Sequence, residues 1–171
     1  MKNHIFCRIL TLCFALAVCF LPVLGQAAPT PCDMEVLRLI NEQRAARGLC
    51  ELIMDSRINE AAAIRAEETS RFFSHDRPDG SDCLTVFADI GMTCSTSGEN
   101  LTTGMEMPAE RAVENWLDSP DHLDNILYAP FTHTGIAHYT AQNGRVYWVQ
   151  LFAAPISGMG EAVTEIEEEE D

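Results

Sequence analysis

The sequence predicts an α+β fold in which helices cover a β-sheet on both sides. Helical patterns come first along the chain and a β-hairpin pattern comes last, an order typical of α+β domains. Both predicted hairpin strands carry apolar residues on their two faces, and strands of this kind are normally covered on both sides. The 171 residues are enough for one domain with a sizeable core.

Two amphipathic helices open the predicted domain. The first is expected over residues 33–47, with Asp33 as N-cap and Gly48 just past its end. Its apolar face is formed by Met34, Leu37 and Ile40. The second is expected from Ser56, as N-cap, to about Phe73, because this segment is rich in alanine and has a continuous apolar stripe.

Shorter elements follow. One or two helical turns are predicted within residues 83–91, an amphipathic helix within 107–119 and a short helix within 120–127. Pro108 suits the first turn of its helix, and Ser119 and Pro120 suit the N-cap and first position of the next. The hairpin is predicted from the strands 133–140 and 146–153, joined by a turn at Asn143 and Gly144.

The first 27 residues resemble a secretory signal peptide. A basic start and a short apolar run precede small residues, with cleavage expected after Ala27. A retained membrane anchor and a lipid-modified Cys19 are the alternatives, but Pro22 interrupts the run and Val18 is bulky for a lipidation signal. The predicted organisation is therefore signal peptide 1–27, folded domain 28–158 and acidic disordered tail 159–171, in a secreted or periplasmic protein without a stable membrane span after cleavage.

The net charge of the chain limits the classes of partner that it can bind. Removal of the signal leaves nine arginines against 26 acidic residues, a formal net charge of −17. Such a protein repels phosphate groups, which argues against binding to nucleic acid or to anionic lipid surfaces through charge. Divalent cations remain compatible with it.

Four cysteines lie in the predicted mature chain: Cys32, Cys50, Cys83 and Cys94. An even number in an oxidising compartment predicts two disulfides. Cys32 and Cys50 flank the first helix, whose ends lie about 22 Å apart, so their direct pairing is disfavoured. Cys83 and Cys94 are easily joined across the turn at Gly91. A four-cysteine zinc site is the alternative, and the lack of a Cys-x-x-Cys pair argues against it.

Three side chains are candidates for chemistry. His75 follows the second helix, Glu99 lies in SGENLTTG (97–104), and His122 stands early in a short helix. The stretch 97–104 is too polar and glycine-bracketed for an ordinary core strand or helix. Two imidazoles and a carboxylate are a typical divalent-metal set. The structural alternatives are a loop hydrogen bond for His75, a surface position for His122, and a buried acid that binds backbone amides for Glu99.

Four ordered segments resemble the bacterial secreted branch of the CAP superfamily, which includes cysteine-rich secretory proteins, antigen 5 and plant pathogenesis-related proteins. They are FFSHDRPDGS, GENLTTG, AVENWLDSPDHLDNIL and GIAHYTAQNGRVYWVQLFA. The resemblance runs from about Cys32 to Ala153. It implies a three-layer α-β-α sandwich with a cleft where two histidines and two acids meet, and where some members bind zinc or another divalent ion.

Transferred by position, the resemblance makes His75 and His122 the two histidines and Glu99 the first acid. The position of the second acid, three residues after the helix tryptophan, holds Ser119, and the neighbouring Asp118 does not match the motif. The bacterial branch commonly has serine there. A three-ligand site with an open position for water or a ligand is therefore implied.

Three functions compete. The favoured one is a secreted binding module for a divalent ion, with a small ligand, a lipid or a protein as further partner. The second is a metal-assisted or serine hydrolase, using Ser74, Ser97 or Ser119, although neither a Gly-x-Ser-x-Gly elbow nor a His-Glu-x-x-His helix is present. The third is an envelope or host interaction protein without catalysis. The sequence favours binding over catalysis.

Overall fold

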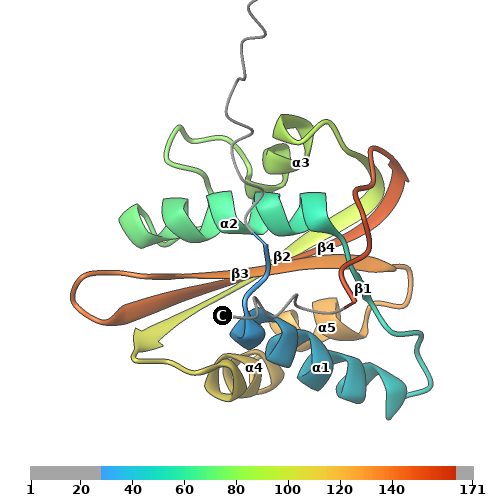
Figure 1. Ribbon diagram of the computed structural model, residues 1–171, viewed down its shortest axis with the longest axis horizontal. Helices are drawn as coiled ribbons and strands as arrows, with labels where there is room; N and C mark the ends of the chain where they lie inside the picture. Colours follow the sequence, from blue (N-terminus) through green and yellow to red (C-terminus); the bar gives the residue numbers. More distant parts are fainter. Residues whose placement is uncertain (1–27, 165–171) are drawn as a thin grey trace, which may run out of the picture.

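A computed structural model describes residues 28–164 of the chain (Figure 1). Its elements, in order, are α1 (Pro31–Ala45), β1 (Ile53–Met54), α2 (Ser56–Arg71), the 3-10 helix η1 (Cys83–Thr85), α3 (Val86–Asp89), β2 (Thr93–Met105), α4 (Ala109–Leu117), α5 (Pro120–Leu127), β3 (His133–Thr140) and β4 (Arg145–Ser157). The strands form one sheet in the order β1-β3-β4-β2. The β1–β3 pair is parallel, and the pairs made by β4 are antiparallel.

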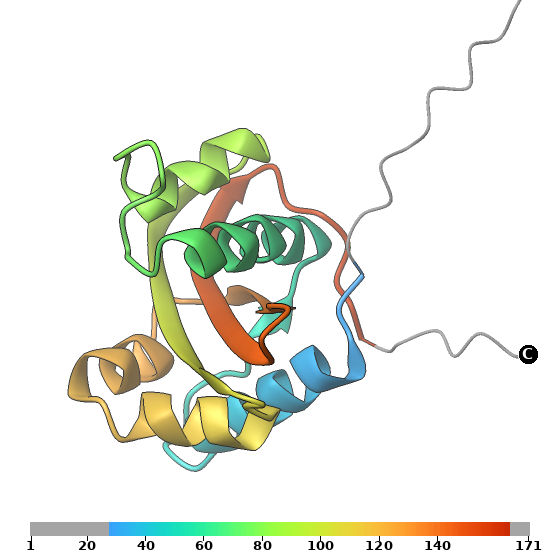
Figure 2. The same cartoon turned by 90° about the vertical axis from the view of Figure 1, so that its left-hand side faces the viewer.

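The sheet lies between two helical layers, as Figures 1 and 2 show. One layer contains α2 and α3, and the other contains α1, α4 and α5. Strand β4 serves both layers, because Trp148 and Phe152 join the core beneath α1 and α4 whereas Val149 and Leu151 join the core beneath α2. The predicted three-layer α-β-α sandwich is confirmed.

Three helices begin at other residues than the sequence indicated. Thr30 caps α1, because its hydroxyl accepts from the Asp33 amide while Asp33 Oδ2 accepts from the Thr30 amide, which makes a capping box. Asp55, and not Ser56, caps α2 by accepting from the amides of residues 57 and 58. Pro108 occupies the N-cap position of α4 and not its first turn.

Strand β2 corrects the prediction that 97–104 is too polar for a core strand. This 13-residue strand pairs with β4 along its length, with irregularities near Cys94. Its polar side chains at Glu99 and Asn100 are buried but receive hydrogen bonds from the helices on either side. Tertiary partners that are distant in sequence therefore stabilise a strand which its own composition disfavours. The two-residue β1 was also not predicted.

The C-terminal part of the described chain packs along β1. The amide of Gly160 donates to Asp55 Oδ2 (2.7 Å), and the amide of Val163 donates to the Met54 carbonyl (2.8 Å). Gly160 and Val163 thus contact the end of β1 and the residue after it, and the boundary after residue 158 stays a prediction. The expected signal peptide, 1–27, and the end of the acidic tail, 165–171, lie outside the described residues.

All four cysteines within residues 28–164 are free thiols, so the two expected disulfides are not confirmed. Cys32 lies in the first turn of α1 and Cys50 beyond its far end, in line with the geometric argument against their pairing. Cys83 is buried and Cys94 is half-buried. Among the described helices, none is both long and apolar enough to cross a bilayer.

Candidate functional site

Glu99 and Asn100 lie on β2, an edge strand, and consecutive strand residues point to opposite faces of a sheet. Glu99 faces α2, where it meets Arg65. Asn100 faces α5, where its Nδ2 donates to the His122 carbonyl at 3.1 Å and its Oδ1 accepts from Asn125 at 2.9 Å. One step along β2 therefore connects both helical layers.

Arg65 of α2 binds the Glu99 carboxylate through both of its oxygens. Nε donates to Oε2 at 2.7 Å and Nη2 donates to Oε1 at 3.2 Å. Both side chains are buried, with 0% and 1% of their surfaces exposed. Arg65 also donates to Glu68 Oε2 (2.7 Å) and to the Ser74 carbonyl (2.9 Å). The sequence analysis missed this arginine, because arginine within a helix is usually exposed.

His75 lies in the loop after α2, and its Nδ1 is 2.9 Å from Glu99 Oε1. The side chain is 58% exposed, so the rest of the ring is open to solvent. The hydrogen bond to Glu99 raises the pKa of His75 above its ordinary value, while burial and the charge of Arg65 oppose that rise. A neutral His75 that donates from Nδ1 to the carboxylate leaves the lone pair of its Nε2 free.

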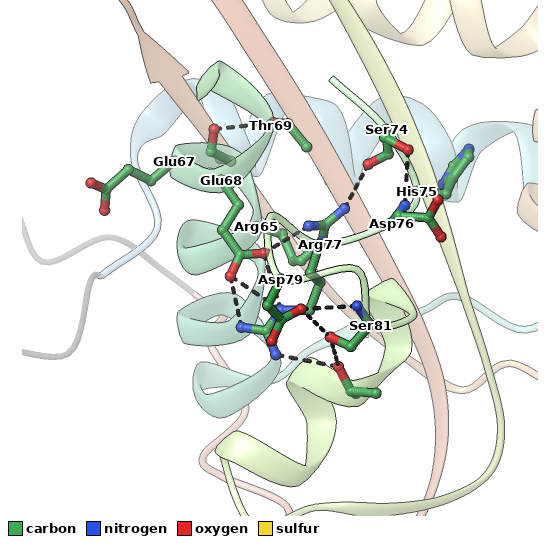
Figure 3. A network of polar contacts seen from close by, with 12 residues as sticks. Arg65, Glu67, Glu68, Thr69, Ser74, His75, Asp76, Arg77, Asp79 and Ser81 are labelled. Atoms are coloured by element: carbon green, nitrogen blue, oxygen red, sulfur yellow. Dashed lines mark hydrogen bonds and ion pairs between the residues drawn. The ribbon is translucent and has the colours of Figure 1, made fainter. Parts of the chain in front are cut away.

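The loop that carries His75 is fixed to α2 by a second arginine, Arg77, which Figure 3 shows beside Arg65. Arg77 Nη2 donates to Glu68 Oε1 at 2.7 Å, and its Nη1 donates to Asp89 Oδ2 at 2.7 Å. The carbonyl of His75 accepts from the Cys83 amide at 3.0 Å. These contacts hold the position of His75 relative to β2.

His122 lies in the first turn of α5, on the other side of β2 from Arg65. Its Nδ1 is buried and has no hydrogen-bond partner within residues 28–164. Burial lowers the pKa of His122, and the charge of His75 lowers it further. The charge of one imidazole thus acts on the other.

His75, Glu99 and Cys83 form a group whose ligand atoms all lie within 4.8 Å of one another, and His122 is not part of it. This His/Cys/Glu group can hold a metal ion. Burial and the neighbouring carboxylate of Glu99 raise the pKa of the Cys83 thiol to about 12. Cys83 was expected in a disulfide, and only the approach of η1 to β2 reveals its place beside Glu99.

The other two candidates lie at the junction of α4 and α5. Asp118 is the C-cap of α4 and is exposed, and Ser119 is the N-cap of α5. Within residues 28–164, neither side chain is hydrogen-bonded to His75, Glu99 or His122. The structure therefore brings His75 and Glu99 into contact, and a place for Asp118 and Ser119 in the cleft stays a prediction.

A separate hollow of about 380 Å³ lies along α1, away from these residues. It is lined by Met34, Leu37, Arg38, Asn41, Glu42, Ala45 and Glu51. Volumes of this order are typical of small-molecule sites. A small ligand or lipid as partner stays a prediction.

Comparison with known proteins decides the family. The profile of the cysteine-rich secretory protein family, CAP, matches residues 37–152. The chain belongs to the CAP family. The Bacillus subtilis protein YkwD is 29% identical to this CAP protein over 122 residues, which are 70% of this chain and 46% of YkwD.

Solved structures share the CAP fold. An extracellular protein containing an SCP domain from Bacillus anthracis has a TM-score of 0.64 at 23% identity, over 70% of this chain and 39% of its own. An outer surface protein from Borrelia burgdorferi has a TM-score of 0.67 at 22% identity, over 75% of this chain and 96% of its own. NaASP2 with Zn²⁺ has a TM-score of 0.56 at 13% identity, over 72% and 79%. This chain thus spans less than half the length of YkwD and of the B. anthracis protein.

Proposed function

We propose that this CAP protein binds a divalent metal ion, with zinc as the favoured ion, through the imidazoles of His75 and His122. Glu99 would orient His75 through Nδ1, in the carboxylate–histidine–metal arrangement that is common in proteins. The observation that carries the proposal is the buried Nδ1 of His122, which has no partner among the described residues. The charge of His75, whose own Nδ1 is already bound, lowers the pKa of this same imidazole. A buried polar atom without a partner is rare and calls for a ligand.

The donor chemistry fits this proposal. Neutral imidazoles suit zinc, copper and nickel. Burial lowers the pKa of His122, which favours its neutral form. The zinc present in the NaASP2 structure, although on a chain of only 13% identity, supports the same ion here. A bound ion would act as a Lewis acid with room for a further ligand.

Binding fits the contacts better than hydrolysis. Within the described residues, no serine hydroxyl is hydrogen-bonded to His75 or His122, and Ser74 Oγ instead accepts from the Asp76 amide at 3.0 Å. A serine nucleophile needs such a base within hydrogen-bond reach. An extracytoplasmic location belongs to the same proposal, and the extracellular and outer-surface descriptions of the B. anthracis and B. burgdorferi proteins support it.

Isothermal titration with zinc at pH 7.5 to 8, roughly one unit above the ordinary histidine pKa, tests the proposal. We expect one ion per chain, and we expect His75→Ala combined with His122→Ala to abolish binding. His133→Ala is the matched control, because His133 lies on β3 and bonds to Thr132; its zinc affinity should equal that of the wild type. Undiminished binding by the double variant would refute the proposed site.

Cobalt separates the imidazole pair from the His75, Cys83 and Glu99 group. A thiolate ligand gives Co²⁺ a strong sulfur-to-metal charge-transfer band, which imidazoles do not. Because the proposed ligands are the two imidazoles and not the Cys83 thiolate, we expect that band to be absent. A band that disappears in Cys83→Ser but persists in Cys94→Ser would assign the ion to the cysteine-containing group instead.

A further inference from the structure

We propose that Arg65 withholds the Glu99 carboxylate from the metal ion, so that this arginine sets the affinity and the metal selectivity of the site. The inference rests on the proposed metal-binding function and assigns to Arg65 a role that the histidines do not have. Glu99 then positions His75 and does not coordinate the ion.

The hydrogen bonds of Glu99 are the first argument. A carboxylate has about four acceptor positions. Arg65 takes one on each oxygen, and His75 takes a further one on Oε1. The Cys83 sulfur lies against the same group. Little acceptor capacity remains for an ion unless the guanidinium leaves.

The guanidinium is also held in place. Its Nη1 is bound to Glu68 and its Nη2 to the Ser74 carbonyl, while the whole side chain is buried. Glu68 is fixed in turn by Arg77, as the dashed contacts in Figure 3 show. Arg65 therefore cannot turn away when an ion arrives, because each of its contacts would have to break in a buried position.

The positive charge of Arg65 also keeps a metal ion away from Glu99. The positive guanidinium neutralises Glu99 and repels a second cation in the same place. The site consequently offers neutral nitrogen donors and no free anionic oxygen. Metals that prefer imidazole, such as zinc, are accepted, whereas Mn²⁺ and Mg²⁺, which prefer carboxylate ligands, are rejected.

The test compares metal affinities in a double-mutant cycle. Titrations with Zn²⁺ and with Mn²⁺ are performed on the wild type, Arg65→Gln, Glu99→Gln and the double variant. Because affinity rises with the number of charged ligands, we expect Arg65→Gln to bind zinc about tenfold more tightly and to gain Mn²⁺ binding. The gain should vanish when Glu99→Gln is added. A residue with only a structural role would lower affinity when replaced.

Controls keep the result interpretable. Arg71→Gln removes an exposed arginine of the same helix that pairs with Glu67, and its affinities should not change. If Arg65→Gln does not fold, as judged by circular dichroism, Arg65→Lys replaces it; a single ammonium frees part of the carboxylate and should give a smaller gain of the same sign.

The outcomes also separate this inference from the proposed function. Unchanged or weaker zinc binding by folded Arg65→Gln or Arg65→Lys would overturn the inference and leave the histidine site intact. A wild type that binds no zinc, beside an Arg65 variant that binds it only when Glu99 is present, would refute the proposed function and support the inference.

Discussion

His75 and Glu99 form the contact on which the site depends, and its strength can be measured as a pKa. The hydrogen bond to Glu99 holds the pKa of His75 above the ordinary value of about 6.5. We expect Glu99→Gln to lower the pKa of His75, because a neutral amide stabilises imidazolium less than a carboxylate does. Titration of the metal-free protein by NMR measures it. An unchanged His75 pKa would show that the contact is absent in solution.

The raised pKa of His75 predicts how both the stability of the fold and the affinity for zinc change with pH. Since the folded-state pKa is the higher one, protonated His75 stabilises the fold fully below about pH 6.5, and this contribution is lost as the pH rises through the folded-state value. Metal binding has the opposite dependence, because the ion needs neutral imidazole. Zinc affinity should therefore rise with pH and level off only above the raised pKa of His75.

At the scale of single residues, the sequence predicted the site candidates His75 and Glu99 better than the residues that contact them. His75 and Glu99, 24 positions apart, do meet; their residue types made them candidates, and the family resemblance placed them at one site. Arg65 and Cys83 were missed. One resembled an ordinary helix arginine and the other an ordinary secreted-protein cysteine, and only the packing of α2 and η1 against β2 shows what they contact.

At the scale of elements, Arg44 joins α1 to the end of α5. Its buried guanidinium donates to four backbone carbonyls: Cys50 (2.8 Å), Ile126 (2.8 Å), Tyr128 (3.2 Å) and Phe131 (3.1 Å). We expect Arg44→Met to lower the free energy of unfolding by roughly 3 kcal/mol or more, because buried acceptors lose their donors. Urea unfolding followed by circular dichroism measures it.

Arg47, in the turn just after α1, provides the matched comparison. It is exposed, and its side chain donates to the carbonyl and to the side-chain oxygen of Gln43, four residues earlier. Arg47→Met should therefore change stability by less than about 0.5 kcal/mol. Equal effects of the two substitutions would mean that the carbonyl contacts of Arg44 contribute nothing to the fold.

Element prediction succeeded where local patterns and packing agree. Helix α5 begins at Pro120 after Ser119 as predicted, and the hairpin turns at Asn143 and Gly144. Strand β2 was missed because polar residues near Glu99 occupy both faces of the strand, so apolar and polar residues do not alternate there. Hydrophobic periodicity cannot reveal a strand whose buried side chains are satisfied by an arginine and an asparagine from helices elsewhere in the chain.

For the whole molecule, the C-terminal segment closes the sheet edge at β1. Besides the bonds of Gly160 and Val163, the Ser56 amide donates to the Glu161 carbonyl (2.9 Å) and the Glu161 amide donates to Ser56 Oγ (3.0 Å). A chain that ends at Ser157 loses all four hydrogen bonds. We expect it to be less stable by about 2–4 kcal/mol, measured by urea unfolding.

A chain that ends at Thr164 is the control for this truncation, because it keeps all four contacts. Its stability should exceed that of the shorter chain. Equal stability of the two would show that the segment packs on β1 without stabilising the fold, and the folded domain would then end near residue 158.

The adjacency of Glu99 and Asn100 has a consequence for how the sheet is assembled. A strand that slips by one residue turns every side chain to the opposite face. In β2 that slip would place Asn100 against Arg65 and carry Glu99 toward the carbonyl of His122, so that the buried guanidinium would keep Glu68 but lose Glu99. Breaking a buried ion pair in this way costs about 3–5 kcal/mol. The Arg65–Glu99 ion pair therefore favours the observed register of β2. A substitution that removes Glu99 would remove this contribution to the pairing of β2 with β4.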